Sequence, residues 1–131
     1  MNTKEKQKYL EKALKQYEAG ILLLRHGFNN DSLSRLYYAF RSLAICIVGK
    51  PLKGKWKHPA LMKKVIIEID NKRLFSLSRE ERKLIKDFPD LREEADYDPI
   101  EIPEEKLQTY IKLVERFLRE VKNYVEYSNQ D

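Results

Sequence analysis

Residues 35–44 have the sequence RLYYAFRSLA, the middle of a stretch in which apolar side chains recur every three or four residues. This spacing places the apolar side chains along one face of an α-helix. The helix is predicted to end at Gly49 and Pro51, and Asn30 or Asp31 is predicted to cap its start. The predicted core-facing residues of this helix are Leu33, Leu36, Tyr37, Phe40, Leu43, Ala44 and Ile47.

Two longer segments with the same period lie before and after this helix. Residues 4–25 form the first predicted helix, which stops at Gly27 and folds back on the next helix as an antiparallel hairpin. Residues 104–127 form the last and longest predicted helix, which follows the loop DPIEIP at residues 98–103.

The middle of the chain predicts two more helices. Pro59 suits the first turn of one helix, because its missing N–H would have no partner there in any case. Ser78 followed by Glu81 is a capping-box pattern that predicts the start of the next helix. Pro89 is expected to kink or end that helix, with Asp90 capping a short helical continuation.

Length and composition limit the class of protein. A chain of 131 residues with 42% hydrophobic content has material for one core. We therefore expect residues 1–131 to form one all-α domain, an up-and-down bundle of four to five helices. No apolar run approaches the roughly 20 residues that cross a bilayer, which predicts a cytoplasmic protein without membrane contact. Cys46, the single cysteine, lies in the apolar run LAICIV and is expected to be an inert core residue.

Charge is segregated along the chain. Residues 50–73 contain eight Lys or Arg and two acids, a net charge of +6. Residues 87–105 contain nine acids and only Arg92 as a base, a net charge of −8. A molecule of this kind attracts phosphate at one region and repels it at another. The alternative is that both segments are solvated surfaces without a ligand.

Two common kinds of site have no support in the residue pattern. The chain has only two histidines, His26 and His58, and no CxxC or HExxH spacing, so no metal is expected. The four glycines are scattered and form no phosphate-binding loop, and no cofactor is predicted.

The loop KPLKGKWKH at residues 50–58 is the first candidate binding element. Its lysines alternate with an indole and an imidazole, rings that stack on bases while ammonium groups contact phosphates. In the alternative interpretation the tryptophan folds back onto the core. The candidate nucleotide- or RNA-binding residues of this loop are Lys53, Lys55, Trp56, Lys57 and His58.

Two helical segments supply further candidates. Tyr38 and Arg41 lie three residues apart beside the apolar face of the second helix, and Arg41 is the better candidate for a phosphate or carboxylate contact. Tyr37 belongs to the apolar face, where its hydroxyl is expected to bond a core partner. Arg92 and Asp96 have i, i+4 spacing, for which a plain surface ion pair is the alternative to a functional role.

The ordered set RLYYAF, then KH, then LREEADYD at residues 91–98 resembles the HEPN domain family over nearly the whole chain. The resemblance implies a helical bundle that forms homodimers and binds RNA or nucleotides. It also implies a minimal nucleotidyltransferase as partner, in a toxin–antitoxin-like system. Many HEPN domains are metal-independent ribonucleases with an arginine followed a few residues later by a histidine. Arg92 matches that arginine, and Tyr97 stands where the histidine is expected.

The tyrosine at this position argues against efficient catalysis. Tyrosine has a reference pKa of about 10, which is poorly matched to acid–base catalysis at neutral pH. Binding without efficient cleavage is therefore the leading interpretation. One alternative is an active metal-independent ribonuclease toxin in which Arg92 works with Tyr97, Asp96 or His58. Another is a non-catalytic interaction module whose acidic face binds a cationic protein.

Overall fold

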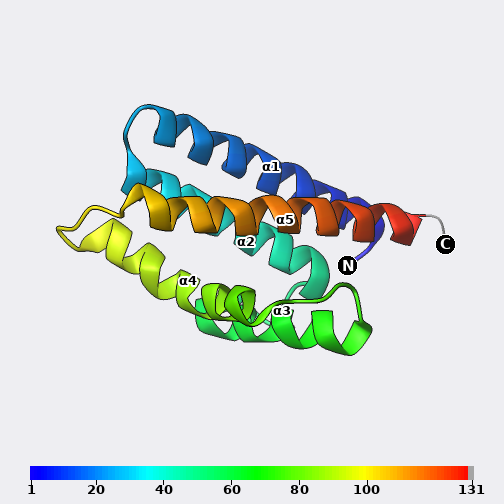
Figure 1. Ribbon diagram of the computed structural model, residues 1–131. Helices are drawn as coiled ribbons and strands as arrows, with labels where there is room; N and C mark the ends of the chain where they lie inside the picture. The colour runs from blue at the N-terminus through cyan, green and yellow to red at the C-terminus, as the bar shows by residue number, and fades with distance from the viewer. Residues whose placement is uncertain (130–131) are drawn as a thin grey trace.

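The computed structural model describes residues 1–129, which contain five α-helices and no β-strand. The helices are α1 (Thr3–Arg25), α2 (Asn29–Val48), α3 (His58–Lys72), α4 (Arg79–Tyr97) and α5 (Glu104–Asn129). The prediction of an all-α fold is confirmed. Figure 1 shows α1 and α2 as an antiparallel hairpin, with α5 lying along both. No helix in this range is long and apolar enough to cross a bilayer.

Helix α2 lies at the centre of the molecule and packs against the other four helices. Eleven of its 20 residues are buried, among them Cys46, as the apolar pattern predicted. Helix α1 lies close against α2 at Gly20, whose carbonyl accepts a 2.7 Å hydrogen bond from the buried hydroxyl of Ser32. A Cβ on Gly20 would lie 3.2 Å from Cγ of Leu36, so the glycine permits this close approach.

Aromatic rings from three helices form the middle of the core. The rings of Phe40 in α2 and Phe117 in α5 are 4.6 Å apart. Those of Phe88 in α4 and Tyr110 in α5 are 4.4 Å apart. Tyr37 packs edge-on against Phe88 at 5.3 Å, which places it at the border of this aromatic group. Offset and edge-on contacts at such distances are the favoured geometries of aromatic pairs.

Two helix starts have the chemistry that was predicted for them. Pro59 lies in the first turn of α3. The hydroxyl of Ser78 accepts from the backbone N–H of Glu81, whose carboxylate accepts in turn from the N–H of Ser78, a complete capping box. The helix does not end at Pro89, because this buried proline lies inside α4 and the helix continues to Tyr97, so Asp90 caps no new helix; a kink at Pro89 stays a prediction.

The prediction that Asn30 or Asp31 caps α2 is also wrong, because the helix has already begun before either residue. The Asn30 amide instead donates to the carbonyls of Ala95 at 3.1 Å and Ile100 at 2.6 Å. Its amide oxygen accepts from the backbone N–H of Ile102 at 2.8 Å. One side chain therefore fixes the end of α4 and the following loop against the start of α2.

We predict that Asn30→Ala lowers the free energy of unfolding by about 2–3 kcal/mol. The substitution leaves the N–H of the buried Ile102 without its partner, which costs about 1–3 kcal/mol, and it removes the hydrogen bonds to the more accessible carbonyls of Ala95 and Ile100. Urea denaturation followed by circular dichroism measures the change. The matched control is Asp31→Ala at the exposed neighbouring position, where we expect a change within about 0.5 kcal/mol. Equal losses in both variants would contradict this role of Asn30.

Candidate functional site

Five side chains from three helices meet beside α2, and we call them the arginine–histidine cluster. They are Tyr37, Tyr38 and Arg41 of α2, His58 at the start of α3, and Arg92 of α4. The His58 ring lies 5.1 Å from the ring of Tyr37 and 6.3 Å from that of Tyr38. The guanidinium carbon of Arg92 lies 5.6 Å from the centre of the Tyr37 ring, a cation–π contact.

The loop before α3 brings His58 to this place. The indole N–H of Trp56 donates to the carbonyl of Gly49 at 2.8 Å, which ties the loop to the end of α2. The carbonyl of Trp56 accepts from Nη2 of Arg41 at 2.9 Å. Trp56 is half-buried against the core, as the alternative interpretation of this residue proposed. Its contact with a ligand stays a prediction, but its contacts within the protein set the course of the chain into His58.

A hydrogen bond joins the hydroxyl of Tyr37 to Nδ1 of His58. Burial raises the pKa of Tyr37 to about 12, so the phenol keeps its proton at neutral pH. Burial, together with the positive charges of Arg41 and Arg92, lowers the pKa of His58, and Glu93 opposes this shift only in part. The imidazole is therefore neutral at neutral pH.

The positions of the protons in the Tyr37–His58 pair follow from the need of both side chains for hydrogen-bond partners. The buried phenol needs an acceptor, and a neutral imidazole has one nitrogen that accepts and one that donates. The arrangement that satisfies both has the Tyr37 hydroxyl donating to Nδ1 of His58. Nε2 then carries the hydrogen, and the ring presents an N–H donor on its other side.

Both arginines have hydrogen-bonding capacity that the protein leaves unused. Nη1 of Arg41 and Nε of Arg92 are buried and have no hydrogen-bond partner within residues 1–129. The Arg92 side chain is only 12% exposed and pairs with Asp96 at 3.3 Å. Arg41 forms no ion pair with any described residue. Two guanidinium groups with free donors at one place are complementary to an oxyanion.

The structure does not bring Tyr97 to Arg92. The two residues are five apart on one helix, which is about 140° around its axis, and Tyr97 is 75% exposed. His58 contacts the same tyrosine ring as Arg92 from another helix instead. Nothing in the local spacing signals this arrangement, because the two residues belong to different helices. Asp96 lies where it was expected, one turn after Arg92.

The lysines of the loop before α3 are exposed, and none of them belongs to the cluster itself. Lys55 lines a cavity of about 180 Å³ together with Arg41 and Trp56. Lys53 and Lys57 extend from the same loop into solvent. These ammonium groups are therefore placed for long-range attraction of an anion and for contacts outside the cluster.

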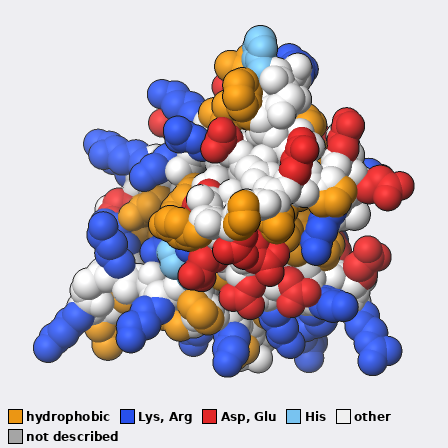
Figure 2. Space-filling view, turned by 90° about the vertical axis from the view of Figure 1, so that its left-hand side faces the viewer, with side chains coloured by type: hydrophobic (Ala, Val, Ile, Leu, Met, Phe, Trp, Pro, Cys, Tyr) orange, Lys and Arg blue, Asp and Glu red, His pale blue; other side chains and the backbone are white. Residues whose placement is uncertain are grey.

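The charge segregation of the sequence persists in space. Residues 87–105 comprise the second half of α4 and the loop into α5. Figure 2 views this end of the molecule and shows acidic side chains gathered in the middle of the face, with Lys and Arg side chains at its left and lower margins. An anion approaching this end is thus directed away from the centre and toward the basic margins.

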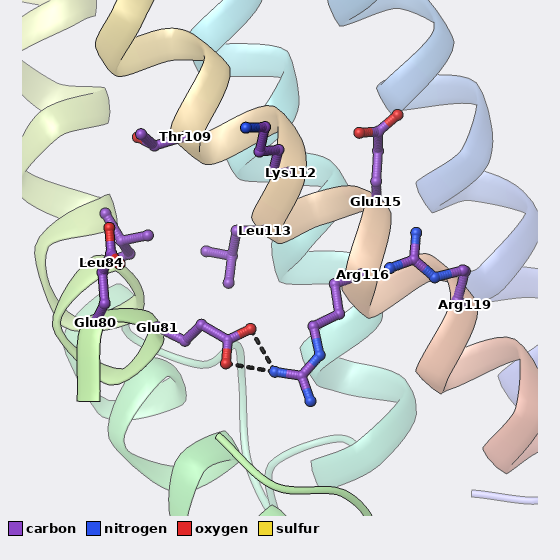
Figure 3. Close-up of a pocket in the computed structure, with 9 residues that line it drawn as sticks. All are labelled: Glu80, Glu81, Leu84, Thr109, Lys112, Leu113, Glu115, Arg116 and Arg119. Atoms are coloured by element: carbon purple, nitrogen blue, oxygen red, sulfur yellow. Dashed lines mark hydrogen bonds and ion pairs between the residues drawn. The ribbon is translucent and has the colours of Figure 1, made fainter. Parts of the chain in front are cut away.

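A second hollow, of about 520 Å³, lies between α4 and α5. Figure 3 shows Glu81 and Arg116 facing each other in it, and both carboxylate oxygens accept from Arg116. The positive charge of Arg116 is therefore neutralised within the protein. No group of three His, Cys, Asp or Glu that could hold a metal ion occurs among the described residues. Among the described residues, the buried side-chain donors without a hydrogen-bond partner are Nη1 of Arg41 and Nε of Arg92, and both belong to the arginine–histidine cluster.

Comparison with known protein families identifies the family of this chain. The sequence profile of the HEPN domain matches residues 7–124, a range that includes every residue of the cluster. The chain belongs to the HEPN family. HEPN membership makes this a domain of the nucleotide- or RNA-binding or ribonuclease-like kind. No curated protein matches this HEPN chain.

We predict that the free energy of unfolding of this HEPN protein falls as the pH drops below about 6.5, the reference pKa of histidine. The folded-state pKa of His58 is lowered, so the unfolded chain binds a proton at a higher pH than the folded chain does. Stability then decreases with falling pH until the folded-state pKa is reached. Urea denaturation at pH values from about 5 to about 7 should show this dependence of the free energy of unfolding on pH in the wild type and a weaker dependence in His58→Gln. Identical slopes would contradict the lowered pKa.

Proposed function

We propose that this HEPN protein binds phosphate groups of RNA or of a nucleotide at the arginine–histidine cluster, without efficient cleavage. The observation that carries the proposal is the pair of buried, unpartnered N–H groups on Arg41 and Arg92. Phosphate oxygens satisfy such donors with short, charge-assisted hydrogen bonds. The Nε2–H of neutral His58 adds a third donor of the kind that an anion requires.

The surroundings of the cluster favour an extended ligand over a bare phosphate ion. The half-buried ring of Tyr38 offers an apolar surface for a base or sugar, since base–aromatic stacking is tolerant of sequence. The exposed lysines of the loop before α3 add attraction for neighbouring phosphates. Single-stranded RNA has both components, and a nucleotide has one unit of each.

Metal-independent cleavage of RNA is the second candidate function. In that reaction a base removes the 2′-hydroxyl proton, the 2′-oxygen attacks phosphorus, and the 5′-oxygen leaves with a proton from an acid. Neutral His58 beside Arg92 favours this candidate, because the guanidinium can stabilise charge on the phosphate. However, Nδ1 of His58 already accepts from Tyr37, and Nε2 carries a hydrogen. No basic nitrogen of His58 is then available to a ligand, so we place binding ahead of cleavage.

We predict that Arg41→Ala and Arg92→Ala each weaken binding of a labelled single-stranded RNA, measured by fluorescence anisotropy. A hydrogen bond to a charged group is worth about 1.5–3 kcal/mol, which corresponds to a loss of affinity of about tenfold or more. Each variant should also reduce the slope of log K against log salt by about 0.7, the contribution of one phosphate contact to a single strand. Arg79→Ala removes the same charge from an exposed position outside the cluster and is the matched control.

Two outcomes would overturn this proposal. Unchanged affinity in both cluster variants would exclude the arginines as phosphate ligands. Cleavage of the RNA in EDTA that is lost in Arg92→Ala would instead establish the ribonuclease. Circular dichroism of each variant confirms that the comparison is made between folded proteins.

We further propose that the protein is a cytoplasmic homodimer that works with a minimal nucleotidyltransferase in a toxin–antitoxin-like system. Family membership supports the partnership, and the acidic segment at residues 87–105 is suited to a basic surface on such a partner. Light scattering should give the mass of two chains, and a nucleotidyltransferase encoded in a neighbouring gene should co-purify. Asp98→Lys with Glu101→Lys should weaken the complex. A single chain that binds no such partner would contradict both parts.

A further inference from the structure

A groove next to the cluster is not explained by phosphate binding. This α2 groove has a volume of about 490 Å³ and lies between α1 and α2. Its lining residues are Gln16, Leu23, Asp31, Ser34, Arg35 and Tyr38. Tyr38 belongs to both the groove and the arginine–histidine cluster. A ligand whose phosphate occupies the cluster therefore has the groove beside it, at Tyr38.

The polar chemistry of the groove is concentrated in Asp31 and Arg35. These residues are four apart on α2, so their Cβ atoms are separated by about 5–6 Å on one face of the helix. Both are exposed, and none of the ion pairs among residues 1–129 involves either of them. A carboxylate and a guanidinium that form no ion pair with each other therefore line the groove one helical turn apart.

Guanine is the base whose edges match this pair. Its N1–H and N2–H₂ groups donate toward a carboxylate, while O6 and N7 accept from an arginine, the commonest specific contact to guanine. Adenine presents an acceptor at N1 and lacks O6, and pyrimidines lack N7. Asp31 and Arg35 can therefore both form hydrogen bonds with guanine. Any other base can form only some of these hydrogen bonds.

We infer that the α2 groove binds a guanine base of RNA or of a guanine nucleotide. The base stacks on Tyr38, Asp31 accepts from its N1–H and N2–H₂ edge, and Arg35 donates to O6 and N7. The adjoining phosphate lies against Arg41 and Arg92 in the cluster. This inference rests on the proposed phosphate binding and adds a base preference to it.

The test compares labelled pentaribonucleotides UUGUU, UUAUU and UUCUU, which differ only at the central base. In fluorescence anisotropy with the full chain, we expect UUGUU to bind at least about fivefold more tightly than the other two, the lower limit for a good bidentate base contact. Asp31→Asn should remove this preference, because one amide N–H₂ then faces the donors of guanine. Glu126→Gln makes the same change of charge at an exposed position on α5 and should leave the preference intact.

The possible failures are distinguishable. If all three RNAs bind wild type equally and Arg41→Ala weakens all three, phosphate binding stands and the guanine site is overturned. A preference for UUGUU that survives Asp31→Asn also overturns the guanine site. If no RNA binds wild type, the proposed function is overturned and the guanine site with it.

Discussion

The hydroxyl of Tyr37 joins the hydrophobic core of this protein to its polar surface. The ring packs against Phe88 in the core, and the guanidinium of Arg92 lies near its face. A buried hydroxyl needs a partner, and here the partner is His58, the first residue of α3. The loop before α3 must therefore end where His58 reaches Tyr37. This one side chain therefore links the start of α3, the end of that loop and the environment of Arg92.

The cluster is an unfavourable arrangement for folding and a favourable one for binding. Arg41 and Arg92 lie near one imidazole, and both contribute to lowering its pKa. Asp96 offsets the charge of Arg92, whereas no carboxylate among the described residues pairs with Arg41. Buried donors without acceptors cost free energy in the free protein. Sites that bind or react commonly retain such costs, which an incoming anion relieves.

The sequence predicted the parts of the fold that depend on local chemistry. The capping box at Ser78 and the proline in the first turn of α3 act within one helical turn, so the residue order alone reveals them. The error at Asn30 has the opposite cause, because its partners lie about 70 positions away in the α4–α5 connection. For the same reason the sequence suggested Arg41, His58 and Arg92 separately. Only the folded chain shows that they share one place and that Tyr97 does not.

The cluster is assembled from α2, α3 and α4, so it exists only when all three helices are packed. A ligand of the cluster therefore binds only the folded chain and holds these three helices together. A ligand present at 100 times its dissociation constant would add about 2.7 kcal/mol to the free energy of unfolding. Domains of this size commonly have only about 5–15 kcal/mol in total. Proteases degrade opened chains, so the lifetime of this protein would lengthen when its ligand is plentiful and shorten when it is scarce.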